Sequence, residues 1–124
     1  MRSMALTIFS TTFDADDPAV LAAFWGEVFE GSTVDTSNEF LATLTRPDGG
    51  LMMFIKVEED KSAKNRCHLD LHADSEAQVD AEVQRLAAVG AKVGGTFREY
   101  GAYWTTIQDP EGNELCIGCL VPDA

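Results

Sequence analysis

The chain has 124 residues, of which 45% are hydrophobic and 24% are charged, and its formal net charge at pH 7 is −12. This length suffices for one compact domain, or for two small repeated modules that share a core, and leaves no room for separate cofactor and substrate domains. Because 21 acidic residues face only 9 Lys and Arg, the composition argues against binding to nucleic acid or to an anionic membrane surface.

The start of the sequence carries neither a long apolar core nor a cleavage-site pattern, so we expect a cytoplasmic protein. Its three cysteines do not form a disulfide framework. Cys116 and Cys119 are spaced as Cys-x-x-Cys, but they fall in a predicted strand, where this odd separation puts their sulfur atoms on opposite faces of the sheet. We interpret them as structural thiols rather than as a redox pair.

The first half of the chain predicts a strand, a helix and three further strands. Residues 5–13 are rich in β-branched and aromatic side chains, which favour a strand. Asp17 followed by Pro18 predicts the start of a helix, and Gly31 predicts its end. The predicted buried stripe of this helix consists of Leu21, Phe24, Trp25 and Val28. Strands are predicted at 32–35, 40–45 and 51–57, with a hairpin turn at 47–50.

The second half repeats this plan. Residues 66–72 predict a strand, Ser75 with Gln78 forms a capping box, and Gly90 ends the helix. The predicted buried stripe consists of Val79, Val83 and Leu86. Strands are predicted at 91–97, 103–108 and 113–119, with a turn at 110–113.

The repeat predicts a single domain over residues 1–124 with two modules, 5–57 and 66–120, joined by a charged linker at 58–65. The expected fold class is α+β, with two βαβββ modules. A single helix covers only one face of each sheet, so we expect the helices on the outside and the curled sheets around a shared cavity. Such a cavity is the default position of a ligand site.

Several separated motifs carry a family resemblance. They lie at residues 16–18 and 21–25, at 64–71, at 90–91 and at 104–116. In these segments the chain resembles the glyoxalase-like domains of the vicinal oxygen chelate superfamily, also called the glyoxalase, bleomycin resistance protein and dioxygenase superfamily. The resemblance implies paired βαβββ modules, commonly in a homodimer. In catalytic members it implies a divalent metal held by His and Glu side chains on the inner face of the sheets.

The resemblance also implies four metal positions, which in this chain are occupied by Ser10, Met53, His68 and Cys116. Only His68 matches the family ligands, because the hydroxyl of Ser10 is a weak donor and the thioether of Met53 does not suit magnesium or manganese. We therefore expect no family metal and no other cofactor. If a metal binds, His68 and Cys116 are the candidate ligands.

Strand alternation predicts which side chains face the cavity. His68 and Asp70 share a face, so a His beside a carboxylate could act as a general base, and both are catalytic candidates. The alternative is that Asp70 and His72 are hydrogen-bonded structural groups near the sheet edge. The remaining predicted cavity residues are Ser10, Thr12, Met53, Ile55 and Cys116.

The segment 97–104 is interpreted as a long loop that concentrates aromatic residues around a glycine. Tyr100 and Trp104 could form a rim that stacks on a flat ligand, with Arg98 supplying a charge. The alternative is a hairpin whose aromatic side chains pack locally.

Three functions are compatible with these features. The first, which we favour, is a small-molecule binding protein without the family metal, for which the acidic composition suits a cationic or planar ligand. The second is a lyase, isomerase or dioxygenase that uses His68 with a metal, or His68 with Asp70 as an acid–base pair. The third is a regulatory or interaction module with a vestigial cavity.

Overall fold

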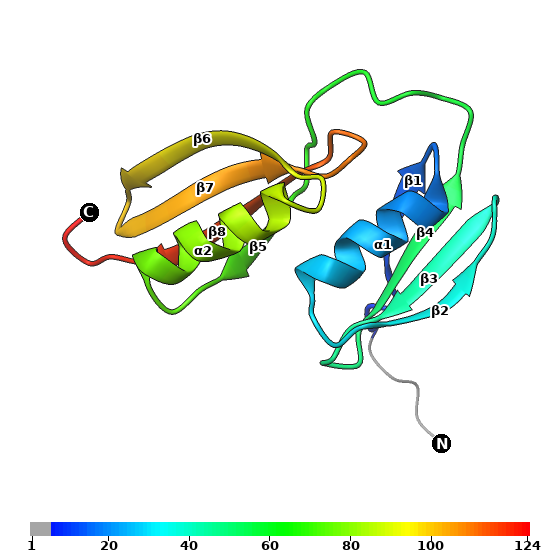
Figure 1. Cartoon of the computed structure of the whole chain (residues 1–124), viewed down its shortest axis with the longest axis horizontal. Coiled ribbons are helices and arrows are strands. Elements are labelled where there is room, and N and C mark those ends of the chain that lie inside the picture. The colour runs from blue at the N-terminus through cyan, green and yellow to red at the C-terminus, as the bar shows by residue number, and fades with distance from the viewer. Residues whose placement is uncertain (1–5) are drawn as a thin grey trace. The chain divides into compact units, whose positions relative to one another are not determined.

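A computed structural model describes residues 6–124 and divides the chain into two compact units, Met1–Glu58 and Glu59–Ala124 (Figure 1). Each unit is a βαβββ module, which confirms the predicted α+β class. The elements of the first are β1 (Thr11–Ala15), α1 (Pro18–Val28), β2 (Thr33–Ser37), β3 (Leu41–Thr45) and β4 (Leu51–Lys56). The elements of the second are β5 (Leu69–His72), α2 (Glu76–Ala87), β6 (Lys92–Glu99), β7 (Ala102–Gln108) and β8 (Glu114–Leu120).

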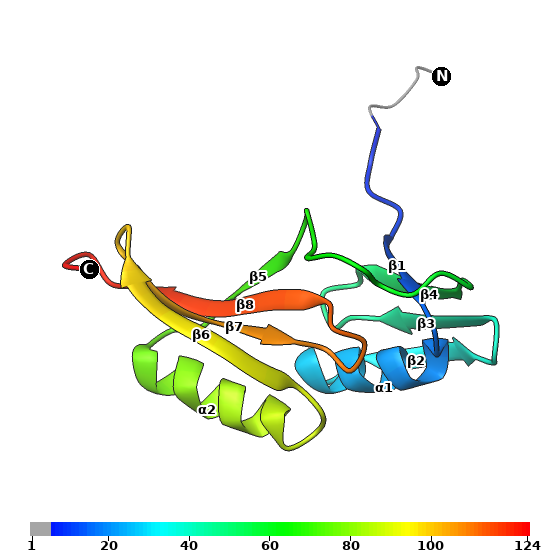
Figure 2. The same ribbon diagram turned by 90° about the horizontal axis from the view of Figure 1, so that it is seen from above.

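The two sheets have the same topology. Their strand orders are β1-β4-β3-β2 and β5-β8-β7-β6, so the first and last strands of each module pair in parallel and the other pairs are antiparallel. Within the second module, α2 lies along one face of the sheet β5–β8 (Figure 2). None of the helices in residues 6–124 is long and apolar enough to cross a membrane.

The helix boundaries follow from the predicted caps. The Asp17 carboxylate accepts a hydrogen bond from the backbone N–H of Val20, and the Ser75 hydroxyl accepts one from that of Gln78. Beyond the helix ends, Gly31 and Gly90 adopt φ values of 91° and 118°, which glycine reaches without a Cβ clash.

The core of each module lies between its helix and its sheet. In the first module Trp25 is fully buried, and its ring centroid lies 5.1 Å from the ring centroid of Phe13. The ring centroids of Phe13 and Phe54 are 5.6 Å apart. In the second module the predicted helical stripe of Val79, Val83 and Leu86 is buried. The opposite face of each sheet is therefore left to more exposed side chains.

Two strands start three or more residues later than predicted. The strand predicted at 5–13 is β1, Thr11–Ala15, and residue 5 lies outside the described residues. Thr11 pairs with Met52, and β4 begins one residue earlier at Leu51, so residues 6–9 have no facing strand. The strand predicted at 66–72 begins only at Leu69, opposite Leu115, because β8 itself begins at residue 114.

The loop predicted at 97–104 is instead a tight hairpin. Strand β6 continues to Glu99 and β7 begins at Ala102, so only Tyr100 and Gly101 form the turn. Both have positive φ, 56° and 74°, as a type I′ turn requires. The aromatic residues on either side of the turn therefore belong to strands, and alternation decides which face each one occupies.

The linker is attached to the second sheet through Glu114, at the start of β8. This side chain is 7% exposed, and its Oε1 accepts a hydrogen bond of 2.8 Å from the backbone N–H of Asn65. Its Oε2 lies 3.4 Å from Nζ of Lys61. Burial raises the pKa of Glu114, but the Asn65 N–H and the Lys61 ammonium outweigh it, so the pKa lies below its ordinary value. The anchored linker fixes the chain three residues before His68.

Candidate functional site

The candidate site lies on the face of the second sheet that α2 does not cover. An open cavity of about 770 Å³ is lined there by residues of β5, β6, β7 and β8 and by Lys64 and His68 just before β5. Strand register arranges these residues in two rows across the sheet. One row consists of Asp70, Cys116 and Thr106, and the other of His72, Gly118, Trp104 and Phe97. The cavity therefore has a polar end and an aromatic floor.

The polar end is a cluster of His68, Asp70 and Cys116. Nδ1 of His68 lies 2.8 Å from Oδ1 of Asp70. One potential metal-binding atom from each of the three side chains lies within 4.8 Å of the others. Because an ionised carboxylate only accepts hydrogen bonds, Nδ1 is the donor, and Nε2 is the imidazole nitrogen left to accept a proton. Asp70 thus orients the imidazole.

Cys116 is not an activated nucleophile in this arrangement. Burial raises the pKa of its thiol above the ordinary value, and the Asp70 carboxylate acts in the same direction. A hydrogen bond of 3.3 Å that it shares with the Thr106 hydroxyl opposes these effects without cancelling them. The thiol therefore stays protonated at neutral pH, unlike the thiols of redox or protease sites.

The aromatic floor is made by Phe97 and Trp104, whose ring centroids are 5.4 Å apart with an interplanar angle of 28°. Two glycines make room for these rings. A Cβ at Gly95 would lie 2.7 Å from Cζ of Phe97, and one at Gly118 would lie 2.8 Å from Cβ of Trp104. A side chain at Gly95 would displace the Phe97 ring, and one at Gly118 would displace Trp104 together with the adjoining β7 backbone, so the glycines allow both residues to lie close against the strands.

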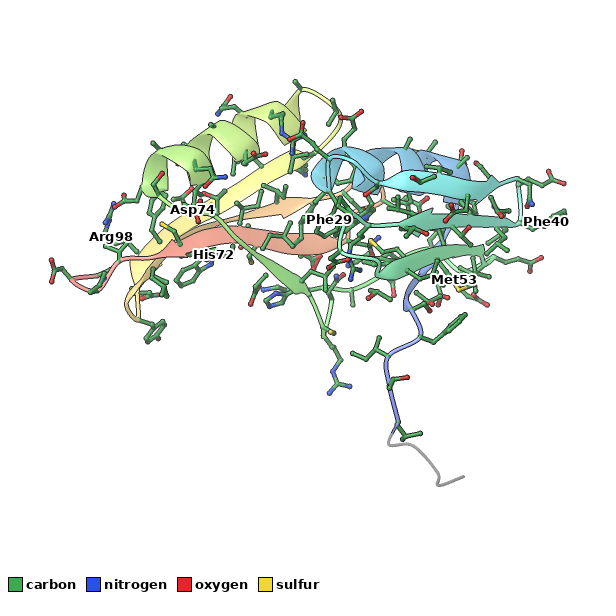
Figure 3. All side chains as sticks on the ribbon, turned by 90° about the horizontal axis from the view of Figure 1, so that it is seen from below. Phe29, Phe40, Met53, His72, Asp74 and Arg98 are labelled. Atoms are coloured by element: carbon green, nitrogen blue, oxygen red, sulfur yellow. The ribbon has the colours of Figure 1, made fainter. Side chains whose placement is uncertain are left out.

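The structure brings four of the predicted site residues together and separates two others from them. His68, Asp70, Trp104 and Cys116 line the cavity. Arg98 alternates with Phe97 and lies on the other face, beside the start of α2 (Figure 3). There its guanidinium binds the Glu76 carboxylate and covers the ring of Tyr103.

Tyr100 is at the hairpin turn with 90% of its surface exposed, and it does not line the cavity. We therefore exclude Arg98 and Tyr100 from the candidate site. Of the two interpretations of this segment, a cavity rim and a hairpin that packs locally, the strand pairing and the contact of Arg98 with the Tyr103 ring agree with the hairpin.

The other four predicted residues belong to the first module. The Ser10 and Thr12 hydroxyl oxygens are 2.7 Å apart, and Thr12 is the register partner of Met53. Met53 alternates with Met52 and Phe54, which are fully buried beneath α1, and so lies on the opposite face of the sheet. Ile55, 38% exposed, follows the same alternation. These residues lie on the first module's sheet, and the cavity described above is lined by the second module alone.

Phe97, Thr106 and the two glycines were absent from the predicted set. Their contribution depends on which residues pair across β6, β7 and β8, and a sequence shows alternation within a strand but not the register between strands. The aromatic cluster around residue 100 was the one available signal.

A family model for the glyoxalase-like domain matches residues 10–118. The chain belongs to the glyoxalase-like domain family. This places it in the vicinal oxygen chelate superfamily, in agreement with the paired βαβββ modules. A search of curated proteins found no significant match.

Solved structures share the fold of this glyoxalase-like domain. A glyoxalase/bleomycin resistance protein/dioxygenase family enzyme from Burkholderia phytofirmans is 20% identical, with a TM-score of 0.76 over 91% of this chain and 98% of that one. A protein from Bacillus cereus described as a possible glyoxalase is 25% identical, with a TM-score of 0.73 over 93% of this chain and 100% of that one. A fosfomycin resistance protein from Listeria monocytogenes is 14% identical, with a TM-score of 0.76 over 97% of this chain and 98% of that one.

The residues of this domain do not fit the divalent metal that the resemblance implies. Ser10 and Met53 supply a hydroxyl and a thioether, and Cys116 supplies a half-buried thiol in place of a carboxylate. A hydroxyl, a thioether, a thiol and one imidazole are not the oxygen-rich set that Mg²⁺ or Mn²⁺ prefers. We derive no reaction step through that metal.

Proposed function

We propose that this glyoxalase-like domain is a small-molecule binding protein that takes a flat ligand on the open face of its second sheet, without the metal of the catalytic members. The observation that carries the proposal is the stacked pair Phe97 and Trp104 beside the polar cluster of His68 and Asp70 in one cavity. A volume of about 770 Å³ lies within the range of drug-sized ligand sites.

The aromatic floor supplies the affinity in this proposal. A flat ligand ring that packs on Trp104 buries apolar area and adds about 0.5–1.5 kcal/mol from ring–ring geometry. The cost of ordering the site is small, because Phe97 and Trp104 already stack on each other and are held by paired strands.

The polar end supplies the orientation. Asp70, with 72% of its side chain exposed, can accept a hydrogen bond or a positive charge from the ligand. The net charge of −12 favours a cationic or neutral ligand over an anionic one. We therefore expect planar aromatic compounds that carry an amine or another hydrogen-bond donor at one end.

A second function, acid–base catalysis, is favoured by the 2.8 Å contact between His68 and Asp70. Histidines that transfer protons are usually arranged in this way: a carboxylate holds one ring nitrogen, and the other ring nitrogen faces the cavity. This reaction would take place on a ligand bound to the same aromatic floor, so both functions require the same cavity.

The experiment is a thermal-shift screen of planar amines and neutral aromatic compounds, followed by titration calorimetry of the compounds that bind. A ligand at 100 times its dissociation constant stabilises the folded state by about 2.7 kcal/mol. We expect Trp104→Ala and Phe97→Ala each to weaken binding about tenfold or more, which corresponds to about 1.4 kcal/mol. Phe40→Ala removes an exposed aromatic ring from the first module and serves as the matched control.

Binding that survives Trp104→Ala, or that Phe40→Ala weakens equally, contradicts the proposal. A screen without a binder also contradicts it and favours the interaction module with a vestigial cavity. If a bound compound is converted and His68→Ala abolishes the conversion while the compound still binds, the catalytic function is the correct one.

A further inference from the structure

The lining of the cavity contains one lysine and one carboxylate. Lys64 lies just before β5, and Asp70 lies within that strand. The other lining residues have apolar, neutral polar or imidazole side chains. Binding sites are arranged so that their charges complement those of the ligand. A cavity with one side chain of each sign therefore suits a ligand that also carries both signs of charge.

The ammonium group of Lys64 is available to a ligand. Within residues 6–124 it has neither an ion-pair partner nor a hydrogen-bond partner, whereas Lys61 is paired with Glu114. Its charge nevertheless reaches the polar end of the cavity. Burial is the main cause of the raised pKa of the Cys116 thiol, and the Lys64 ammonium is among the effects that oppose the rise.

The linker holds the backbone of Lys64 in place. The backbone N–H of Asn65 donates a hydrogen bond of 2.8 Å to Oε1 of Glu114, and the Asn65 side-chain amide donates one of 3.3 Å to the Glu114 carbonyl oxygen. On the other side of Lys64, Nζ of Lys61 lies 3.4 Å from Oε2 of the same carboxylate. Since the backbone is fixed on both sides, a ligand has to order only the lysine side chain, which limits the entropy lost on binding.

Asp70 is the opposite pole of the site. Its Oδ1 accepts a hydrogen bond of 2.8 Å from Nδ1 of His68, which fixes the orientation of the carboxylate. An ionised carboxylate has about four acceptor positions, so others remain for a ligand. Because 72% of the Asp70 side chain is exposed, an ammonium group of the ligand can approach it.

The distance between the polar end and the aromatic floor sets the length of the ligand. Thr106 in the polar row and Trp104 in the aromatic row are two residues apart on β7 and share a face. Two residues of a strand span ~7 Å. A linker of about two carbon atoms between an aromatic ring and its charged groups covers this distance.

We propose that the ligand of this cavity is an aromatic zwitterion, namely an aromatic amino acid or a close analogue. Its ring packs on Trp104, its ammonium donates a hydrogen bond to Asp70, and its carboxylate accepts one from Lys64. This ligand class rests on the function proposed above, to which it adds a carboxylate group on the ligand and the lysine that binds it. A zwitterion has no net charge, which agrees with the acidic composition of the chain.

The test is titration calorimetry of the full chain with three probes that share an indole ring. Tryptophan carries both charged groups, tryptamine carries only the ammonium, and indole-3-propionate carries only the carboxylate. We expect tryptophan to bind about tenfold more tightly than either of the others, because each of them lacks one charge-assisted hydrogen bond. Phenylalanine, phenethylamine and 3-phenylpropionate form the same series on a smaller ring.

Two variants assign the charged groups to their partners. Lys64→Met keeps the aliphatic chain without the ammonium, so tryptophan should bind to it no better than tryptamine. Asp70→Asn keeps the shape without the charge, so tryptophan should bind to it no better than indole-3-propionate. Lys92→Met and Asp14→Asn are the matched controls, because they remove the same charges from exposed residues of β6 and β1 that do not line the cavity. Both controls should bind the probes as the unmodified chain does.

The ligand class is overturned if tryptophan and tryptamine bind the unmodified chain equally well, or if Lys64→Met and Lys92→Met weaken tryptophan binding equally. Lys64 is then an ordinary solvated lysine, and tryptamine binding that Trp104→Ala abolishes leaves the proposed function standing. If no indole or phenyl probe binds but the broader screen finds a flat ligand, only the zwitterion is wrong. If that screen also finds nothing, both proposals fail. Lys64 and Asp70 are exposed, so their variants should fold, and the three probes on the unmodified chain decide the question should one variant not fold.

Discussion

Gly118 provides the sharpest test of the packing on the open face of the second sheet. A Cβ at this position would lie 2.8 Å from Cβ of Trp104 and 3.0 Å from the carbonyl oxygen of Tyr103. Gly118 and Trp104 are register partners in β8 and β7, so the backbones cannot separate without loss of strand pairing. Inserting a methyl group into such a contact costs about 1–3 kcal/mol. We expect Gly118→Ala to lower the free energy of unfolding by this amount and to weaken ligand binding by displacing the Trp104 ring.

Gly26→Ala is the matched control, because the chemical change is the same and the surroundings are not. Gly26 lies inside α1, and a Cβ there would meet nothing within 4 Å. Alanine is favoured over glycine in a helix interior by about 0.5–1 kcal/mol. The same added methyl group should therefore stabilise the first module and destabilise the second.

Urea unfolding followed by tryptophan fluorescence measures both effects. Trp25 is buried in the first module and Trp104 lies in the second, so each module contains one reporter. We expect the urea midpoint of unfolding to fall for Gly118→Ala and to rise for Gly26→Ala. The slope of the free energy of unfolding against urea concentration should be unchanged in both variants. A Gly118→Ala protein as stable as the unmodified chain, with its ligand binding intact, would refute the steric reasoning.

Three further predictions concern anchors and caps. Glu114→Ala should lower the free energy of unfolding by about 1.5–3 kcal/mol, because the Asn65 N–H loses a charged acceptor and Lys61 loses its partner. A decrease of less than about 0.5 kcal/mol in urea unfolding would contradict this prediction. The pKa of Glu114 is lowered in the folded state, so the stability that its carboxylate contributes is complete above the ordinary pKa of 4.5 and is lost as the pH falls through the lowered pKa. Glu114→Gln should therefore lose less stability than the unmodified chain when both are titrated with acid. An equal loss in both proteins would argue against the anchor. Ser75→Ala should cost about 1 kcal/mol because the backbone N–H of Gln78 loses its cap, and an unchanged urea midpoint would show the cap to be dispensable.

Local signals in the sequence were sufficient to determine both helices and the repeat. Asp17 and Ser75 cap the helices as predicted, and Gly31 and Gly90 lie just beyond their ends with positive φ. These features could be predicted because each depends on residues a few positions apart. A cap needs a side-chain oxygen three residues before a free N–H, and a helix end needs a residue that tolerates a left-handed backbone.

Strand ends could not be predicted in the same way. Residues 6–9 have the composition of a strand but are not part of β1, because β4 does not extend far enough to pair with them. A strand is stabilised by its neighbour, so its limits depend on where a distant segment begins. For the same reason His68 lies just before β5 rather than inside it.

The residues of the candidate site were also predictable only where they depend on a single strand. Alternation within one strand was enough to place Asp70 and His72 on one face, and the acidic composition argued against nucleic acid as a partner. Only the tertiary structure decided that Cys116 lies beside Asp70, that Phe97 stacks on Trp104, and that Arg98 lies on the far face with Glu76. The physical reason is that period-2 alternation is a property of a single strand, whereas the neighbours of a side chain are set by register between strands that are far apart in the chain.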